Sequence, residues 1–174
     1  MKIYTLRTLY LFLYLFIASQ GMFYLMGINK ALHNISIAAF IEQRKSIDAV
    51  IGDPLRFLYF TSIGIAILIL VLTFKSPGSI SFITVLLSFI CILADISLAV
   101  QKSIPLNAII NNYPSNNYHN MQTLRTEWLY WINFRGTIAI TGLFILLSGF
   151  LIESFQKSTA GERTKAPNSI STTP

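Results

Sequence analysis

Four apolar stretches that carry almost no charge constrain the fold of this chain more than any other feature. They span residues 8–29, 57–74, 80–100 and 136–152, and Asp95 is the one charged residue inside them. About 20 helical residues cross the ~30 Å hydrocarbon layer of a bilayer. Backbone groups in lipid need hydrogen-bond partners within their own segment, so each stretch should form a helix. The sequence therefore predicts an all-α four-helix transmembrane bundle within residues 1–155.

The composition agrees with a membrane protein and argues against other classes. Hydrophobic residues make up 53% of the chain and charged residues 11%, whereas a soluble domain carries about 25% charged residues. The formal net charge is +6, and the basic residues flank the spans, where they meet lipid head groups. No basic run is interleaved with aromatic residues, so we expect membrane lipids as partners and no nucleic acid.

Metal and cofactor sites have no support in the sequence. Cys91 is the single cysteine, which excludes an intrachain disulfide and a cysteine-based metal site. Neither His33 nor His119 has a second histidine or a carboxylate at metal-ligand spacing. Glycine-rich phosphate loops and dinucleotide-binding fingerprints are also missing. We therefore expect no metal and no cofactor.

The two ends of the chain differ in character. Lys2 and Arg7 precede an apolar run, as in a signal peptide, but the run continues past Gly21 without a small-residue cleavage site, so we expect a retained anchor. Residues 156–174 have the Ser, Thr, Lys and Pro content of a disordered tail. Lys and Arg number six on the side of the termini and seven on the other side, where they sit in longer loops. We expect a cell-membrane protein with both termini cytoplasmic.

The connections between the spans have structure of their own. Residues 36–51 carry apolar side chains at helical spacing, which predicts an amphipathic helix lying in the interface or packed over the bundle end. Arg44 falls on its apolar stripe, four residues before Asp48, a spacing that permits an ion pair. Asp53-Pro54 then marks a boundary before the second span. A tight turn at 76–78 joins spans two and three, and a polar loop at 111–117 precedes a helix from residue 121 that runs into the last span.

Asp95 is the sharpest local signal for function. An ionisable group inside a span is expensive and usually faces the bundle interior. It belongs to a polar stripe at helical spacing, formed by Ser81, Thr84, Ser88, Cys91, Asp95 and Lys102. This stripe should face the other helices, either as interhelical hydrogen bonding or as part of a functional site. In both cases Asp95 needs a partner, for which Arg135 at the entrance to the fourth span is the candidate.

Arginine and tryptophan residues mark the helix that leads into the fourth span. Trp128 and Arg135 are seven residues apart and share a helix face, with Trp131 beside them and Arg125 one turn before Trp128. An aromatic belt with snorkelling arginines would give the same pattern at any membrane interface. Before the polar loop, Pro105 can start a helix, and Asn107 places a polar group where the chain re-enters the interface.

Taken together, these segments resemble the anthrone-oxygenase-like family of small four-span membrane proteins, a domain of unknown function. The resemblance covers about residues 5–153 and rests on the order and spacing of short motifs. These motifs are Gly27-Ile28-Asn29-Lys30-Ala31-Leu32, the segment from Phe40 to Asp48, Pro105-Leu106-Asn107, and Arg125 with Trp128 and Arg135. The chain departs from the family pattern at Leu106, which is usually isoleucine, and at Asn133, where a histidine is common.

The resemblance implies a chemistry for which the chain has suitable residues. Some fungal members are linked to oxidation of anthrones to anthraquinones, without metal or flavin. Such a reaction needs an apolar pocket, a base, and a cation for the developing oxyanion. Asp95 would be the base, Arg125 or Arg135 would stabilise the anion, and Trp128 and Trp131 would stack on the substrate rings. Asn107 would complete the substrate-binding set.

Two functional classes therefore remain open at the level of sequence. One is a cofactor-independent oxygenase acting on a lipophilic aromatic ring compound. The other is a non-catalytic membrane subunit that binds a lipid or a protein partner through the same face. A ligand-sized cavity lined by Asp95, Arg125, Trp128 and Arg135 would favour the enzyme, and solid packing there would favour the subunit.

Overall fold

The computed structural model describes residues 3–113 and 120–165, and all the regular structure in these ranges is helical. The elements are α1 (Ile3–Phe23), η1 (Tyr24–Ile28, kinked at Gly27), α2 (Asn29–Asn34), α3 (Ile37–Thr73), α4 (Ile80–Leu98), η2 (Ala99–Ser103, a π-helical turn), α5 (Ile104–Asn111) and α6 (Met121–Lys165). Residues 114–117 of the predicted polar loop and 166–174 of the predicted tail lie outside the described residues.

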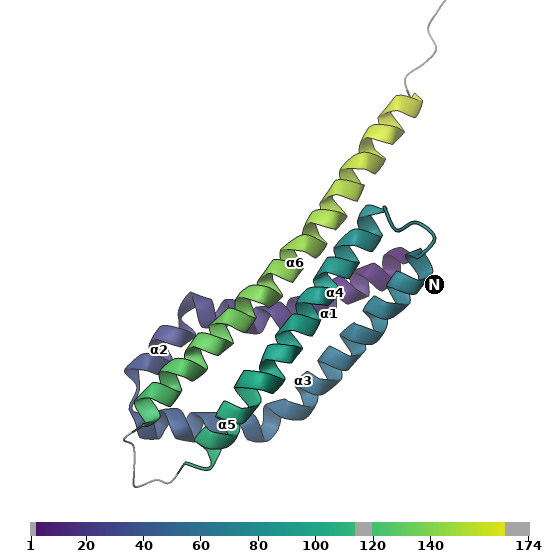
Figure 1. Ribbon diagram of the computed structural model, residues 1–174. Helices are drawn as coiled ribbons and strands as arrows, with labels where there is room; N and C mark the ends of the chain where they lie inside the picture. Colours follow the sequence, from purple (N-terminus) through teal and green to yellow (C-terminus); the bar gives the residue numbers. More distant parts are fainter. Residues whose placement is uncertain (1–2, 114–119, 166–174) are drawn as a thin grey trace, which may run out of the picture.

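The four helical segments are long and apolar enough to cross a membrane (Figure 1). They are Ile3–Asn34, Ile37–Thr73, Ile80–Asn111 and Met121–Gln156. Large apolar side chains face outward from them, such as Phe57 and Phe60, which are 75% and 72% exposed. A soluble protein would bury such residues, so they indicate lipid contact. The predicted all-α four-helix bundle is confirmed, and the chain has the architecture of a multi-pass membrane protein.

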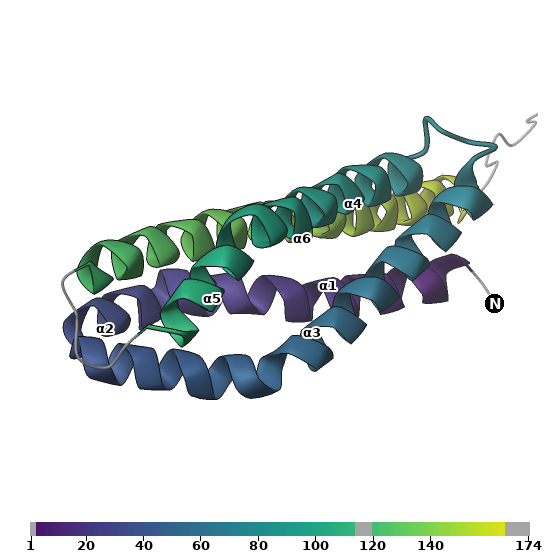
Figure 2. The same cartoon turned by 60° about the horizontal axis from the view of Figure 1, so that its bottom comes forward.

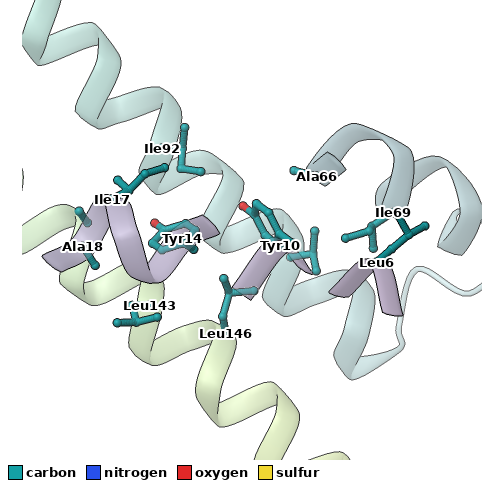
Figure 3. Packing of buried hydrophobic residues seen from close by; sticks show 12 residues of the cluster. Leu6, Tyr10, Tyr14, Ile17, Ala18, Ala66, Ile69, Ile92, Leu143 and Leu146 are labelled. Carbon is teal, nitrogen blue, oxygen red and sulfur yellow. The ribbon is translucent and has the colours of Figure 1, made fainter. Parts of the chain in front are cut away.

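The first core of the bundle lies between the spans and is centred on tyrosines of α1. Tyr10 and Tyr14 are fully buried, and Figure 3 shows them among Leu143 and Leu146 of α6 and Ile92 of α4. Their hydroxyl groups reach α4, where both bond to Ser88 at 3.2 Å. Buried tyrosines need such partners, and Ser81, Ser88 and Asp95 of the predicted polar stripe do face the other helices, whereas Lys102 at its end is exposed.

Glycines bring α1 and α6 into direct backbone contact. A Cβ atom added to Gly21 would lie 2.4 Å from the Cα of Gly136. Small residues at a crossing let membrane helices approach closely, and dispersion contacts then replace the hydrophobic effect that lipid does not supply. Gly64 on α3 is different, because nothing lies within 4 Å of the position that its Cβ would occupy.

The helices are longer than the hydrocarbon layer requires. The 37 residues of α3 would span about 55 Å if straight, against ~30 Å of hydrocarbon. Part of the excess forms a helical cap at the end that bears the long connection, made of α2, residues 37–53, α5 and residues 121–132 (Figures 1 and 2). The cap has its own core of Leu32, Phe40, Ile41, Leu106, Ile110, Met121, Trp128 and Leu129.

The segment 36–51 is helical as predicted, but it is not a separate helix. Ser36 caps its start, because the Ser36 hydroxyl accepts a hydrogen bond from the Ala39 amide at 3.2 Å. The boundary predicted at Asp53-Pro54 is wrong, since α3 continues through Pro54 to Thr73. A proline removes one backbone donor and bends a helix without having to end it. Figure 2 shows that α3 changes direction between its cap portion and its membrane portion.

Candidate functional site

Asp95 is the centre of a polar cluster inside the bundle. Its side chain is almost fully buried, and its Oδ1 accepts a hydrogen bond from Nε of Arg135 at 2.7 Å. Its Oδ2 accepts a hydrogen bond from the hydroxyl of Tyr59. Arg135 also donates from Nη1 to the hydroxyl of Ser103 at 3.1 Å. The predicted Asp95–Arg135 pair is therefore confirmed, and α3, α4 and α6 meet through it.

A small cavity adjoins this cluster at the centre of the four spans. Its volume is about 30 Å³, and its walls are Ile17, Gln20, Gly21, Tyr24, Tyr59, Asp95, Ile132, Arg135, Gly136 and Ala139. Pockets for drug-sized ligands measure about 300–1,000 Å³. The cavity thus has room for a molecule of the size of water and not for a tricyclic ring system. Arg125 and Trp128 do not line it.

Two irregular helical segments lie beside this cluster. The segment η1, which is kinked at Gly27 (φ 168°, ψ −23°), supplies Tyr24 to the cavity wall, and the π-helical turn η2 supplies Ser103 to Arg135. A π-helical turn inserts one residue into a helix and re-aims its side chains, and such turns are frequent at functional sites. The irregular backbone is thus found where two spans present polar groups to Arg135 and the cavity.

Trp128 is the centre of a second polar cluster, in the cap. Its indole Nε1 donates to Oδ1 of Asn107 at 2.6 Å, and the Cζ atom of Arg44 lies 4.3 Å from a ring centroid of Trp128. The guanidinium of Arg44 pairs with Asp48, which confirms the predicted pair, and Asp48 also accepts from Asn111 at 2.9 Å. This network ties α3, α5 and α6 together.

Arg125 belongs to the cap and not to the Asp95 cluster. It is 4% exposed and donates to the backbone carbonyls of Leu32 and Ile35 at 3.2 and 2.8 Å, and to Gln122 at 2.6 Å. Carbonyls at a helix C-terminus lack intrahelical partners, so Arg125 caps the end of α2. Ten residues of α6 separate it from Arg135, a rise of about 15 Å. The predicted site residues are therefore not in one site, since Asp95 and Arg135 lie in the bundle whereas Arg125, Asn107 and Trp128 lie in the cap.

Trp131 of α6 is half-buried against the core of the cap and has exposed neighbours. The Nζ atom of Lys102 is 5.2 Å from its ring centroid, and the rings of Tyr130 and Phe134 lie 5.2 and 6.1 Å away. Lys102, Tyr130 and Phe134 are all exposed. A lysine beside such aromatic rings is typical of side chains at the level of lipid head groups. We call these four residues the Lys102–Trp131 patch.

A third polar cluster lies toward the chain ends. Glu153 of α6 accepts hydrogen bonds from Arg7 of α1 and, at 2.7 Å, from Ser81 of α4. The guanidinium of Arg7 is buried over the ring of Phe150, with 4.6 Å between Cζ and the centroid. The sequence analysis missed this cluster, as well as Tyr59 and Ser103. A tyrosine in an apolar span needs a partner for its hydroxyl, which was the available signal for Tyr59.

Known proteins provide no further guide to this site. Within residues 3–113 and 120–165, no three His, Cys, Asp or Glu side chains gather as a metal ion would require. The chain matches no protein-family model, no curated protein and no solved structure. The function must therefore be argued from the clusters themselves.

Proposed function

We propose that this chain is a non-catalytic membrane protein that binds phospholipid at the Lys102–Trp131 patch. The observation that carries the non-catalytic part is the cavity volume of about 30 Å³ beside Asp95, which leaves no space for a lipophilic substrate. The cap cluster supports the same reading, because Arg44, Asn107, Arg125 and Trp128 are engaged with one another or with backbone carbonyls. Such contacts hold helices in place.

The Lys102–Trp131 patch has the composition of a lipid head-group site. Lys102 offers an exposed ammonium group that an anionic phosphate can approach, while Tyr130 and Phe134 are 58% and 46% exposed. Aromatic rings at this level contact the upper acyl chain and the glycerol region. An anionic lipid gains about 1 kcal/mol from each nearby Lys or Arg. We therefore expect a preference for anionic over zwitterionic phospholipid.

Native mass spectrometry of the detergent-solubilised protein tests this function. The protein is mixed with phosphatidylglycerol or phosphatidylcholine, and the fraction that carries one bound lipid is measured. Lys102→Gln should lower phosphatidylglycerol occupancy about fivefold, the equivalent of one lost cation contact. Lys75→Gln is the matched control, because Lys75 is also exposed but lies in the turn at the opposite end. Equal effects of the two variants would contradict lipid binding at the patch.

A second candidate is the cofactor-independent oxygenase, and the Asp95 cluster is the observation that favours it. A carboxylate and a guanidinium meet beside a cavity, together with the phenol of Tyr59, and the first two are the base and the cation expected for anthrone oxidation. Asp95 would take a proton from the anthrone, the carbanion would add dioxygen, and the peroxide would lose water to leave the quinone. Arg135 would stabilise the intermediate anions. The cavity would have to widen to admit the rings.

Oxygen uptake with a panel of anthrones separates the two candidates. Uptake that yields the quinone, and that is lost in Asp95→Asn and Arg135→Ala, would favour the oxygenase. Full turnover in both variants would exclude this site as the catalyst. Absence of uptake across the panel, together with lipid binding at the patch, is the result that we expect.

We also propose that the protein resides in the cell membrane with both termini cytoplasmic. In this orientation the turn at 76–78 is cytoplasmic, and the helical cap lies on the opposite face. Its support is the count of Lys and Arg in the sequence once the buried or ion-paired arginines Arg7, Arg44, Arg125 and Arg135 are left out, because charges enclosed in the protein do not interact with the cytoplasmic leaflet.

A further inference from the structure

The cavity beside Asp95 is the place where all four spans present a polar side chain to one another. Gln20 comes from α1, Tyr59 from α3, Asp95 from α4 and Arg135 from α6. Ile17, Tyr24 and Ile132 complete the walls together with small residues. The volume of about 30 Å³ exceeds the ~10–15 Å³ that a cavity needs to hold a water molecule.

The hydrogen-bonding capacity of these groups exceeds what the protein itself uses. Arg135 donates to Asp95 and Ser103 through Nε and Nη1 and also interacts with the Tyr59 hydroxyl. Each oxygen of Asp95 accepts one hydrogen bond, Oδ1 from Arg135 and Oδ2 from Tyr59, whereas a carboxylate oxygen can accept two. Gln20 adds both a donor and an acceptor. Unused polar groups away from water are costly.

We propose that this cavity binds one water molecule, which connects Gln20, Asp95 and Arg135 and thereby links three spans, while Tyr59 holds the carboxylate from the fourth. Water can donate and accept, so it satisfies both the guanidinium and the carboxylate. Dioxygen has a similar size but can do neither well, and small apolar molecules prefer dry cavities. The inference concerns the Asp95 cluster and does not depend on lipid binding at the patch.

Isoleucine methyl groups report directly on what occupies the cavity. Ile17 and Ile132 line it, whereas Ile69 and Ile92 are fully buried in the core of the spans and do not. In protein with ¹³C-labelled isoleucine methyls, NMR cross-peaks to water should appear at Ile17 and Ile132 and be missing at Ile69 and Ile92. Water signals no stronger at Ile17 than at Ile69 would overturn the proposal. So would selective relaxation of Ile17 and Ile132 by dissolved dioxygen, which would support the oxygenase.

A cavity-filling substitution provides a second test, because a hydrated cavity and a dry cavity predict opposite changes in the thermal midpoint. Ala139 is 4% exposed and lines the cavity, so Ala139→Val should displace the water, abolish its cross-peaks and lower the thermal midpoint. In a dry cavity the same change would fill a void and raise the midpoint. Ala66→Val is the matched control, because Ala66 is fully buried away from the cavity. That variant should keep the water cross-peaks, and if Ala139→Val does not fold, the wild-type spectra still decide.

Discussion

Removing the charge of Asp95 should cost far more stability than the same change at an exposed aspartate. The side chains of Arg135 and Asp95 are 16% and 3% exposed, whereas those of Arg56 and Asp53 are 76% and 93% exposed. Removing one partner of a buried ion pair costs about 3–5 kcal/mol, because the other charge remains buried. An exposed pair contributes about 0–1 kcal/mol. Asp95→Asn and Asp53→Asn thus compare one chemical change in two environments.

The assay is reversible unfolding in mixed micelles, followed by circular dichroism as the fraction of denaturing detergent rises. Asp95→Asn should lower the free energy of unfolding by about 3–5 kcal/mol and Asp53→Asn by less than about 1 kcal/mol. The double variant Asp95→Asn with Arg135→Gln should recover part of the loss, because no uncompensated charge remains. If Asp95→Asn were no more destabilising than Asp53→Asn, the pair would not be buried as described and the reasoning would fail.

Three further predictions follow from the packing. Gly21→Ala should lower the free energy of unfolding by about 1–3 kcal/mol, because it forces α1 and α6 apart. Gly64→Ala lies where space is open, so it should be neutral or raise the free energy of unfolding by up to about 1 kcal/mol. Unfolding in mixed micelles measures both. Trp128 is 2% exposed, so acrylamide should hardly quench its fluorescence. Each tryptophan can be measured alone, Trp128 in a Trp131→Phe protein and Trp131 in a Trp128→Phe protein, and the quenching of Trp131 should be much stronger. Arg125→Gln should uncap α2, and faster amide hydrogen exchange confined to α2 and its neighbours would reveal this loss.

The sequence was most informative where one physical requirement dominates. A carboxylate inside an apolar span needs a cation, and Arg135 is the basic residue at the entrance to the next span, so the Asp95–Arg135 pair could be predicted. The spans could be located because charges are excluded from hydrocarbon. The helix ends could not, because backbone hydrogen bonding continues wherever packing supports it. This is why α3 passes through Pro54 and builds the cap.

Contacts between distant segments were beyond sequence reasoning. Arg125 bonds to the carbonyl of Ile35, 90 positions away along the chain, and a carbonyl carries no residue-specific signal. From its spacing to Trp128 alone, Arg125 looked like part of one site with Arg135. The structure places about three helical turns between the two arginines. One of them caps a helix, and the other completes an ion pair.

The buried arginines also change the argument about orientation. Charges that interact with the cytoplasmic leaflet must be accessible, but Arg7, Arg44 and Arg125 are only 3–5% exposed, and Arg135 is paired with Asp95. Excluding these four leaves five Lys and Arg on the side of the termini and four on the cap side, out of the six and seven in the sequence.

The remaining count of Lys and Arg in the sequence favours the proposed cytoplasmic termini by one residue, and cysteine labelling can test this orientation in cells. In a Cys91→Ala background, a membrane-impermeant maleimide should label Lys45→Cys on the cap in intact cells, whereas Ser76→Cys in the turn should react only after lysis. Lys45 and Ser76 are both exposed in the structure, so a difference in labelling reports the side of the membrane and not burial. The reverse pattern would overturn the orientation. It would also show that the count of Lys and Arg does not set the topology of this chain, even with the buried arginines left out.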